Sequence, residues 1–160
     1  MKLEPLFRSA DNRLYFLDGR EMPVDAGKKS SPENVSCEKD SLVFVDMPWE
    51  TVGKDEESYN EEFLANMRDF LKKMEDMPAY AVIVPTAVSI PQSAAEKEAF
   101  VASMKHSARR IKDAKSVVGY AIPGYIDSGD FISEFSGKHP HYIYFSHEDS
   151  VLENPSIVRI

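Results

Sequence analysis

Short apolar runs alternate with longer amphipathic segments along most of this chain, and this alternation restricts the fold more than any other feature. The runs are rich in β-branched and aromatic residues and lie at 42–45, 80–84, 117–122 and 142–145. Strand–helix–strand repetition is typical of parallel strands joined by crossover helices. We therefore predict an α/β fold with a mainly parallel sheet of about four or five strands. Two arrangements fit: a partial TIM-barrel-like sheet, and an open three-layer sheet with helices on both faces.

The segments between the runs have the spacing and end signals of helices. Residues 56–77 carry apolar side chains at 3.6-residue spacing and begin with acidic residues, which suit the positive end of a helix dipole. Residues 93–114 begin with Ser-Ala-Ala-Glu, the pattern of a capping box. A shorter helix is expected at 130–135. Basic side chains in the second half of the 93–114 segment are attributed to the negative end of that helix, and they are Lys105, Arg109, Arg110, Lys112 and Lys115.

With 160 residues, the chain has the size of a single α/β domain, and we divide it into three parts. Residues 1–24 are predicted to form a β-hairpin, because they contain two turn sequences between apolar runs. Residues 25–40 are polar and are predicted to be a surface loop. Residues 41–160 hold the β/α units. Because so few strands cannot close a barrel, we expect the hairpin or residues 156–160 to cover one sheet edge, and a homodimer to cover the other.

Composition and charge exclude several classes of protein. A hydrophobic content of 42% is enough for a buried core and excludes wholesale disorder. The 19 Lys and Arg against 27 Asp and Glu give a net charge of −8, which repels nucleic acid and anionic membranes. The first residues have no signal region, and no apolar stretch approaches the roughly 20 residues of a membrane span. We therefore expect a cytoplasmic protein that binds neither nucleic acid nor membrane.

We also expect no cofactor and no metal site. The single cysteine, Cys37, excludes an internal disulfide and offers no thiolate cluster. No glycine-rich phosphate loop follows a predicted strand, so nucleotide binding is not expected. His139 and His141 would point to opposite sides of an extended segment. The group at 147–149, His-Glu-Asp, lacks the further ligands that zinc requires.

Polar and aromatic side chains follow the predicted strands at their carboxyl ends, where parallel α/β sheets bind ligands. Carboxylates there can accept hydrogen bonds from sugar hydroxyls, while flat rings can pack on the apolar face of a pyranose. We therefore predict a cleft for a carbohydrate or another small polar ligand, lined by Asp46, Trp49, Glu50, Thr86, Tyr125, Asp127, His147 and Glu148.

The order of motifs along the chain resembles a known enzyme family. Residues 43–52 (VFVDMPWETV) pass from a strand into a Pro-Trp turn, and an acidic spacer and the helical segment 59–67 (YNEEFLANM) follow. A hairpin sequence at 13–20 precedes them, and a helix–strand unit at 100–120 comes after them. This order resembles the N-terminal half of family 5-like glycoside hydrolases, of the cellulase and mannanase type. The resemblance covers roughly residues 13–125 and implies a truncated (β/α)8 barrel.

The resemblance also implies a loss of catalysis. In that family the fourth strand ends in Asn-Glu, whose glutamate is the general acid/base, whereas Ile122-Pro123-Gly124 stands here. The third strand of the family ends in a sugar-contacting histidine, and here it ends in Thr86-Ala87. The nucleophilic glutamate belongs to a seventh barrel strand, and we expect only about five strands here. We therefore expect no catalytic residue.

Three functions remain open at this point. The first is a non-catalytic, glycoside-hydrolase-like α/β protein that binds a carbohydrate or a protein partner at the carboxyl ends of its strands. The second is a small glycosidase-type hydrolase that uses Asp127 together with Glu148 or His147, since retaining enzymes need two facing carboxyl groups. The third is a domain that serves only protein–protein contact.

Overall fold

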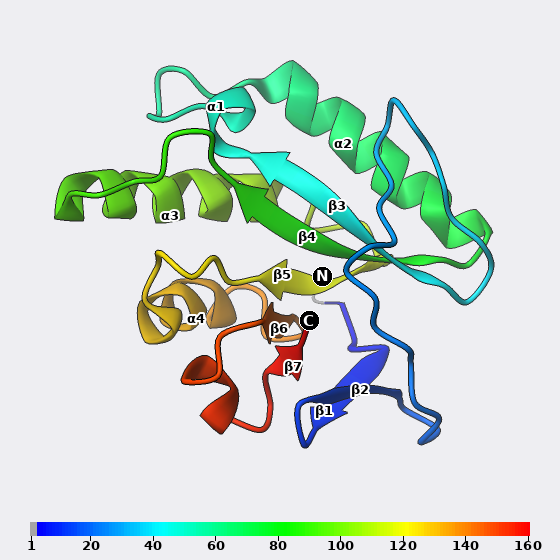
Figure 1. The fold of residues 1–160 in the computed structure, drawn as a ribbon. Helices are drawn as coiled ribbons and strands as arrows, with labels where there is room; N and C mark the ends of the chain where they lie inside the picture. Colours follow the sequence, from blue (N-terminus) through cyan, green and yellow to red (C-terminus); the bar gives the residue numbers. More distant parts are fainter. Residues whose placement is uncertain (1–2) are drawn as a thin grey trace.

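The computed structural model describes residues 3–160 and confirms the α/β fold. A five-stranded parallel sheet has the order β3-β4-β5-β6-β7, and a separate antiparallel hairpin, β1-β2, precedes it (Figure 1). The strands are β1 (Phe7–Ala10), β2 (Arg13–Phe16), β3 (Leu42–Pro48), β4 (Tyr80–Thr86), β5 (Val117–Ala121), β6 (Ile143–Ser146) and β7 (Val158–Arg159).

The three longest helices begin where a side chain accepts a hydrogen bond from a free N–H group of the first turn. The predicted capping box is confirmed at α3, because Ser93 Oγ accepts from the N–H of Glu96 at 3.1 Å and Glu96 Oε1 accepts from the N–H of Ser93 at 3.2 Å. The helix predicted at 56–77 begins only at residue 61, because Asn60 provides the cap. The helices are α1 (Trp49–Val52), α2 (Glu61–Lys73), η1 (Met74–Asp76), α3 (Ala94–Arg110), α4 (Ser128–Ser136) and η2 (Val151–Glu153).

All four α-helices pack on one face of the sheet. Val43, Val45 and Met47 of β3 share a core with side chains of α1 to α4, whereas Leu42 and Phe44 share a second core with the hairpin. Each strand also pairs with the next one in the sequence, so right-handed crossovers place every helix on the same side. The strand order is therefore that of a partial barrel, and within residues 3–160 no helix contributes to the second core.

The hairpin covers the second face of the sheet and is held at its turn by Asn12. The side-chain Nδ2 of Asn12 donates to the carbonyls of Leu152, Asn154 and Ile157 at 3.0, 3.0 and 2.7 Å. Its backbone N–H donates to Pro155 O at 2.9 Å, and its own carbonyl accepts from the N–H of Arg159 at 3.0 Å. Asn12 has a φ of 62°, which asparagine tolerates better than most residues. This contact fixes the hairpin to the segment that leads into β7.

The chain covers part of both sheet edges itself. On one side, the predicted C-terminal segment supplies β7, which pairs with β6. On the other side, the N–H of Phe44 donates to Lys28 O at 2.7 Å and Phe44 O accepts from the N–H of Ser30 at 3.1 Å. Residues 28–30, predicted as loop, therefore pair with β3. The homodimer through a sheet edge stays a prediction.

Strands β5 and β6 approach each other closely at Gly119. The register of β5 against β4 passes from Val117 directly to Gly119, so Val118 is an extra, bulged residue. A Cβ at Gly119 would overlap the backbone carbonyl of Ile143. Only glycine therefore fits the middle of this central strand.

Within residues 3–160, no helix has both the length and the apolar character that a membrane crossing requires.

Candidate functional site

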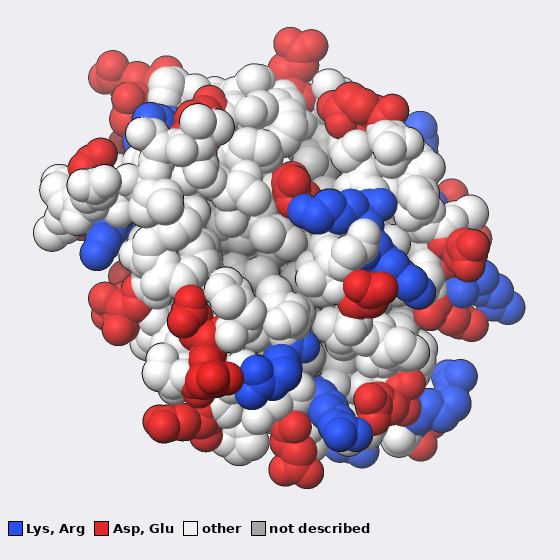
Figure 2. Space-filling view, in the orientation of Figure 1, with Lys and Arg blue, Asp and Glu red and all other residues white. Residues whose placement is uncertain are grey.

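Two adjoining hollows lie at the carboxyl ends of the strands, where the sequence predicts a cleft. The first, here called the apolar groove, has a volume of about 550 Å³ and is lined by residues 84–87, Ile90, residues 121–125, His147 and Ile160. The second, the polar hollow, has a volume of about 620 Å³ and lies along residues 122–128, with Ser146, Glu148 and the start of α3 on its other sides. Figure 2 shows a hollowed, uncharged centre between the ends of β4 and β5, with charged side chains around it.

Tyr125 borders both hollows. Its ring packs edge-on against Phe100 of α3, with centroids 5.5 Å apart, and this contact holds the ring in place while part of it stays accessible. Partial burial raises the pKa of the Tyr125 hydroxyl, and the nearby Glu50 carboxylate raises it further. The site therefore contains a fixed aromatic ring with a neutral hydroxyl, between an apolar and a polar surface.

The structure corrects the predicted role of Trp49 as an aromatic surface in the cleft. Trp49 is the first residue of α1, and this short helix directs its ring into the helix-side core, where it is 3% exposed. The ring packs edge-on against Phe100 at 5.3 Å, and Lys54 Nζ lies 4.8 Å from its centroid. A ligand at the strand ends cannot pack on it.

The carboxylates predicted for the cleft hold local structure instead of standing free. Asp127 caps α4, since its Oδ2 accepts from the N–H of Asp130 at 3.0 Å. Asp46 lies on the hairpin side of β3 and pairs with Lys29 at 3.4 Å. Glu50 accepts from the N–H of Val88 at 3.1 Å and so fixes the loop after β4.

The pKa of Glu50 reflects these contacts. Partial burial opposes ionisation of the Glu50 carboxyl, but the N–H groups of Val88, of Glu50 itself and of Ser89, together with the charge of Lys54, outweigh it, so the pKa lies below its usual value. A carboxyl with a lowered pKa is a poor general acid at neutral pH. Glu50 therefore supports the rim of the site and does not supply a proton.

His147 and Glu148 form the last part of the predicted cleft. His147 Nε2 lies 3.3 Å from Glu148 Oε1, and the imidazole is largely exposed. The Glu148 carboxylate lies over Gly124, because a Cβ added at Gly124 would be only 2.5 Å from Glu148 Oε1. Glycine at position 124 therefore lets a carboxylate approach the loop that separates the two hollows.

The structure thus brings together five of the eight predicted residues. Thr86, Tyr125 and His147 line the apolar groove, and Tyr125, Asp127 and Glu148 line the polar hollow. Asp46, Trp49 and Glu50 lie outside both.

Sequence reasoning also missed parts of the site. Ile90 lies in a loop whose apolar residues are exposed, 50% for Ile90 and 93% for Val88. Apolar residues in a loop between turn residues were the one feature of the sequence that could have indicated this part of the site. Lys97, on the first turns of α3, and Ile160, next to β7, reach the hollows only through the fold.

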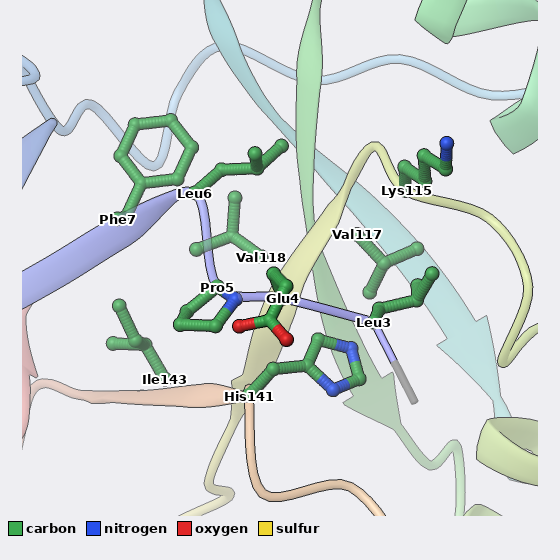
Figure 3. Close-up of a pocket in the computed structure, with 10 residues that line it drawn as sticks. All are labelled: Leu3, Glu4, Pro5, Leu6, Phe7, Lys115, Val117, Val118, His141 and Ile143. Atoms are coloured by element: carbon green, nitrogen blue, oxygen red, sulfur yellow. The ribbon is translucent and has the colours of Figure 1, made fainter. Parts of the chain in front are cut away.

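A third cavity lies at the opposite ends of the strands. It has a volume of about 450 Å³ and is enclosed by residues 3–7, which cross over β5, together with Lys115, Val117, Val118, His141 and Ile143 (Figure 3). Most of its lining is apolar. Burial lowers the pKa of His141, whose Nε2 has no hydrogen-bond partner among the described residues. This cavity offers few groups that could bind sugar hydroxyls.

Within the described part of the chain, no group of three or more His, Cys, Asp and Glu side chains could hold a metal ion.

Comparisons of the chain with family models, with curated proteins and with solved structures give no match. The resemblance to family 5-like glycoside hydrolases and the cytoplasmic location therefore stay predictions, and the geometry of the hollows is the basis for a function.

Proposed function

We propose that this protein is a non-catalytic binding protein for a carbohydrate or a similar polyol. The single observation that carries the proposal is the position of Tyr125, which stands between the apolar groove and the polar hollow. A pyranose has an apolar face and a rim of hydroxyls, and it needs both kinds of surface at once. Small-molecule sites commonly combine apolar walls with a few polar groups, in volumes of about 300–1,000 Å³. The resemblance to glycoside hydrolases favours the same class of ligand.

The carboxylates support binding over hydrolysis. A retaining glycosidase needs two free carboxyl groups about 5–5.5 Å apart, one of them with a raised pKa. Here Asp127 is engaged as a helix cap, and the pKa of Glu50 is lowered. Glu148 contacts His147 and lies over a glycine. Asp127 and Glu148, which line the polar hollow, can still accept hydrogen bonds from hydroxyls with their free lone pairs.

Binding can be tested by titrating the protein with soluble cello- and manno-oligosaccharides and recording backbone NMR shifts. We expect shifts at residues 84–90 and 122–128. A well-placed aromatic contact contributes about 0.5–1.5 kcal/mol, so Tyr125→Ser should weaken binding about 2- to 12-fold. Tyr15→Ser on the hairpin is the matched control, because Tyr15 is also partly exposed but lies outside both hollows. Equal weakening by the two variants, or no shifts with any saccharide, would contradict the proposal.

A small glycosidase remains the second candidate, because Asp127 and Glu148 line the same hollow. Asp127→Asn is suited to testing it, since asparagine caps a helix about as well as aspartate. Cleavage of aryl glycosides that is lost in Asp127→Asn or Glu148→Gln would establish catalysis and contradict a purely binding role. We expect no turnover in any of the three proteins.

A further inference from the structure

A hollow rich in basic residues lies in the helical layer, between the second half of α3 and the end of α4. Its volume is about 390 Å³, and we call it the basic hollow. Its charged and titratable lining residues are Lys105, Arg109, Lys112, Glu134, Lys138 and His139. It shares no residue with the two hollows at the carboxyl ends of the strands.

The cations of the basic hollow exceed the carboxylates that could neutralise them. Lys105 Nζ pairs with Glu134 Oε2 at 2.7 Å and so joins the two helices. Arg109, Lys112 and Lys138 form no ion pair with the described residues, although the chain as a whole carries −8. Three unpaired cations around a small volume repel one another. An anion between them would remove this repulsion.

A buried histidine forms one wall of the basic hollow. His139 is 7% exposed and its ring stacks on Tyr142, with centroids 5.0 Å apart. Its imidazole forms no hydrogen bond with residues 3–160, and its ring nitrogens keep some access to the solvent. Burial, together with the neighbouring His141, Lys112 and Lys138, lowers its pKa to about 4. The imidazole is therefore neutral at pH 7, and its ring N–H is free to donate to a ligand in the hollow.

We propose that the basic hollow binds a phosphate group, either inorganic phosphate or the phosphomonoester of a small molecule. A phosphate dianion has three acceptor oxygens, which match the guanidinium fork of Arg109 and the ammonium groups of Lys112 and Lys138. A ring N–H of His139 can donate to the same anion. The volume admits a small molecule and not a folded partner, and the negative charge of the whole chain opposes a nucleic acid.

The alternative explanation is that these cations only complement the carboxyl ends of α3 and α4. The two explanations predict different effects of a matched control. Lys73 lies in the last turn of α2, is exposed and forms no ion pair with the described residues. Lys73→Gln therefore removes the same charge from another helix end, without touching the basic hollow.

The experiment is a calorimetric titration with inorganic phosphate and with glycerol 3-phosphate, at constant ionic strength set by chloride. Loss of one charge-assisted hydrogen bond should weaken phosphate binding on the order of tenfold in Arg109→Gln and in Lys112→Gln. Lys73→Gln should change it less than about twofold. Equal affinity for both probes would identify inorganic phosphate as sufficient, and tighter binding of the ester would identify a phosphorylated small molecule. No saturable binding of either probe, or equal weakening by Lys73→Gln, would overturn the proposal.

The titration of the His139 imidazole distinguishes the two explanations. If the cations only complemented the helix ends, adding phosphate would not change this titration. A bound dianion stabilises the imidazolium, so the NMR titration midpoint of His139 should rise from about 4 when phosphate is added. The groups that face His139 are Lys112, Lys138 and His141, with Phe135 and Tyr142 against its ring. In Lys112→Gln the midpoint should respond less to phosphate. A midpoint that is independent of phosphate in the native chain would also overturn the proposal.

Discussion

Replacement of Asn12 tests whether the hairpin is part of the cooperative fold or only rests on it. In the Asn12→Gly variant the backbone can keep its left-handed conformation without strain, but the Nδ2 hydrogen bonds to Leu152, Asn154 and Ile157 are lost. Two amide hydrogens serve these three carbonyls, and each hydrogen bond contributes about 0.5–1.5 kcal/mol net, so the variant should lose about 2 kcal/mol. Asn12→Ala should lose about 1 kcal/mol more, because alanine resists a positive φ.

Equilibrium unfolding in urea and differential scanning calorimetry measure these losses. For a chain of this size, about 1 kcal/mol lowers the Tm by about 2–4 °C, so we expect decreases of about 4–8 °C for Asn12→Gly and about 6–12 °C for Asn12→Ala. Asp11→Gly is the control, since Asp11 also has a positive φ, 51°, but no side-chain hydrogen bond to residues 3–160. It should stay within about 0.5 kcal/mol of the native chain. If Asn12→Gly behaved like this control, the hairpin would not be held by its turn.

Two further predictions concern the sheet and its rim. Gly119→Ala should prevent native folding or lower the Tm by more than about 10 °C, because its Cβ would overlap the carbonyl of Ile143; a normal melting curve would show that β5 and β6 can separate at little cost. Glu50→Gln should destabilise the fold most at neutral pH. The folded-state pKa of Glu50 is lowered, so its contribution is present above the unfolded carboxyl pKa and is lost as the pH falls through the folded value. The Tm difference between variant and native chain should therefore shrink below about pH 4, and a constant difference would contradict the assignment.

The parts of the fold that depend on local chemistry were predictable from the sequence. The central strands are short β-branched runs buried on both faces, and α3 begins at a capping box whose two partners are three residues apart. The strand β7 could not be recognised from the sequence pattern. It has two residues, and at least about four are needed to recognise an alternation of apolar and polar side chains. Its position depends on contacts with β6 and with Asn12, far away in the sequence.

The candidate site shows a similar division. The carboxyl ends of the strands were expected to gather, and Thr86, Tyr125 and Glu148 do line hollows there. The direction of Trp49 was not predictable, because it depends on one turn of helix after Pro48. The hydrogen bonds from Val88 to Glu50 involve a backbone N–H, which leaves no mark on a sequence. The basic residues of α3 were visible, but His139 joins them only in three dimensions.

The attachment of the hairpin has a consequence for how the chain reaches its fold. Each parallel strand pairs with its immediate predecessor, so the sheet can grow one strand at a time during synthesis. The hairpin, in contrast, is made first and its turn is fixed last, because the hydrogen bonds of Asn12 span 140 to 145 residues. Leu14 of the hairpin and Val158 of β7 belong to the same core. Until β7 has paired with β6, the sheet surface against which the hairpin packs is therefore incomplete. Such late, non-local contacts slow folding and expose apolar surface meanwhile. We therefore expect apolar surface of the hairpin and the sheet to stay exposed to aggregation until β7 has paired.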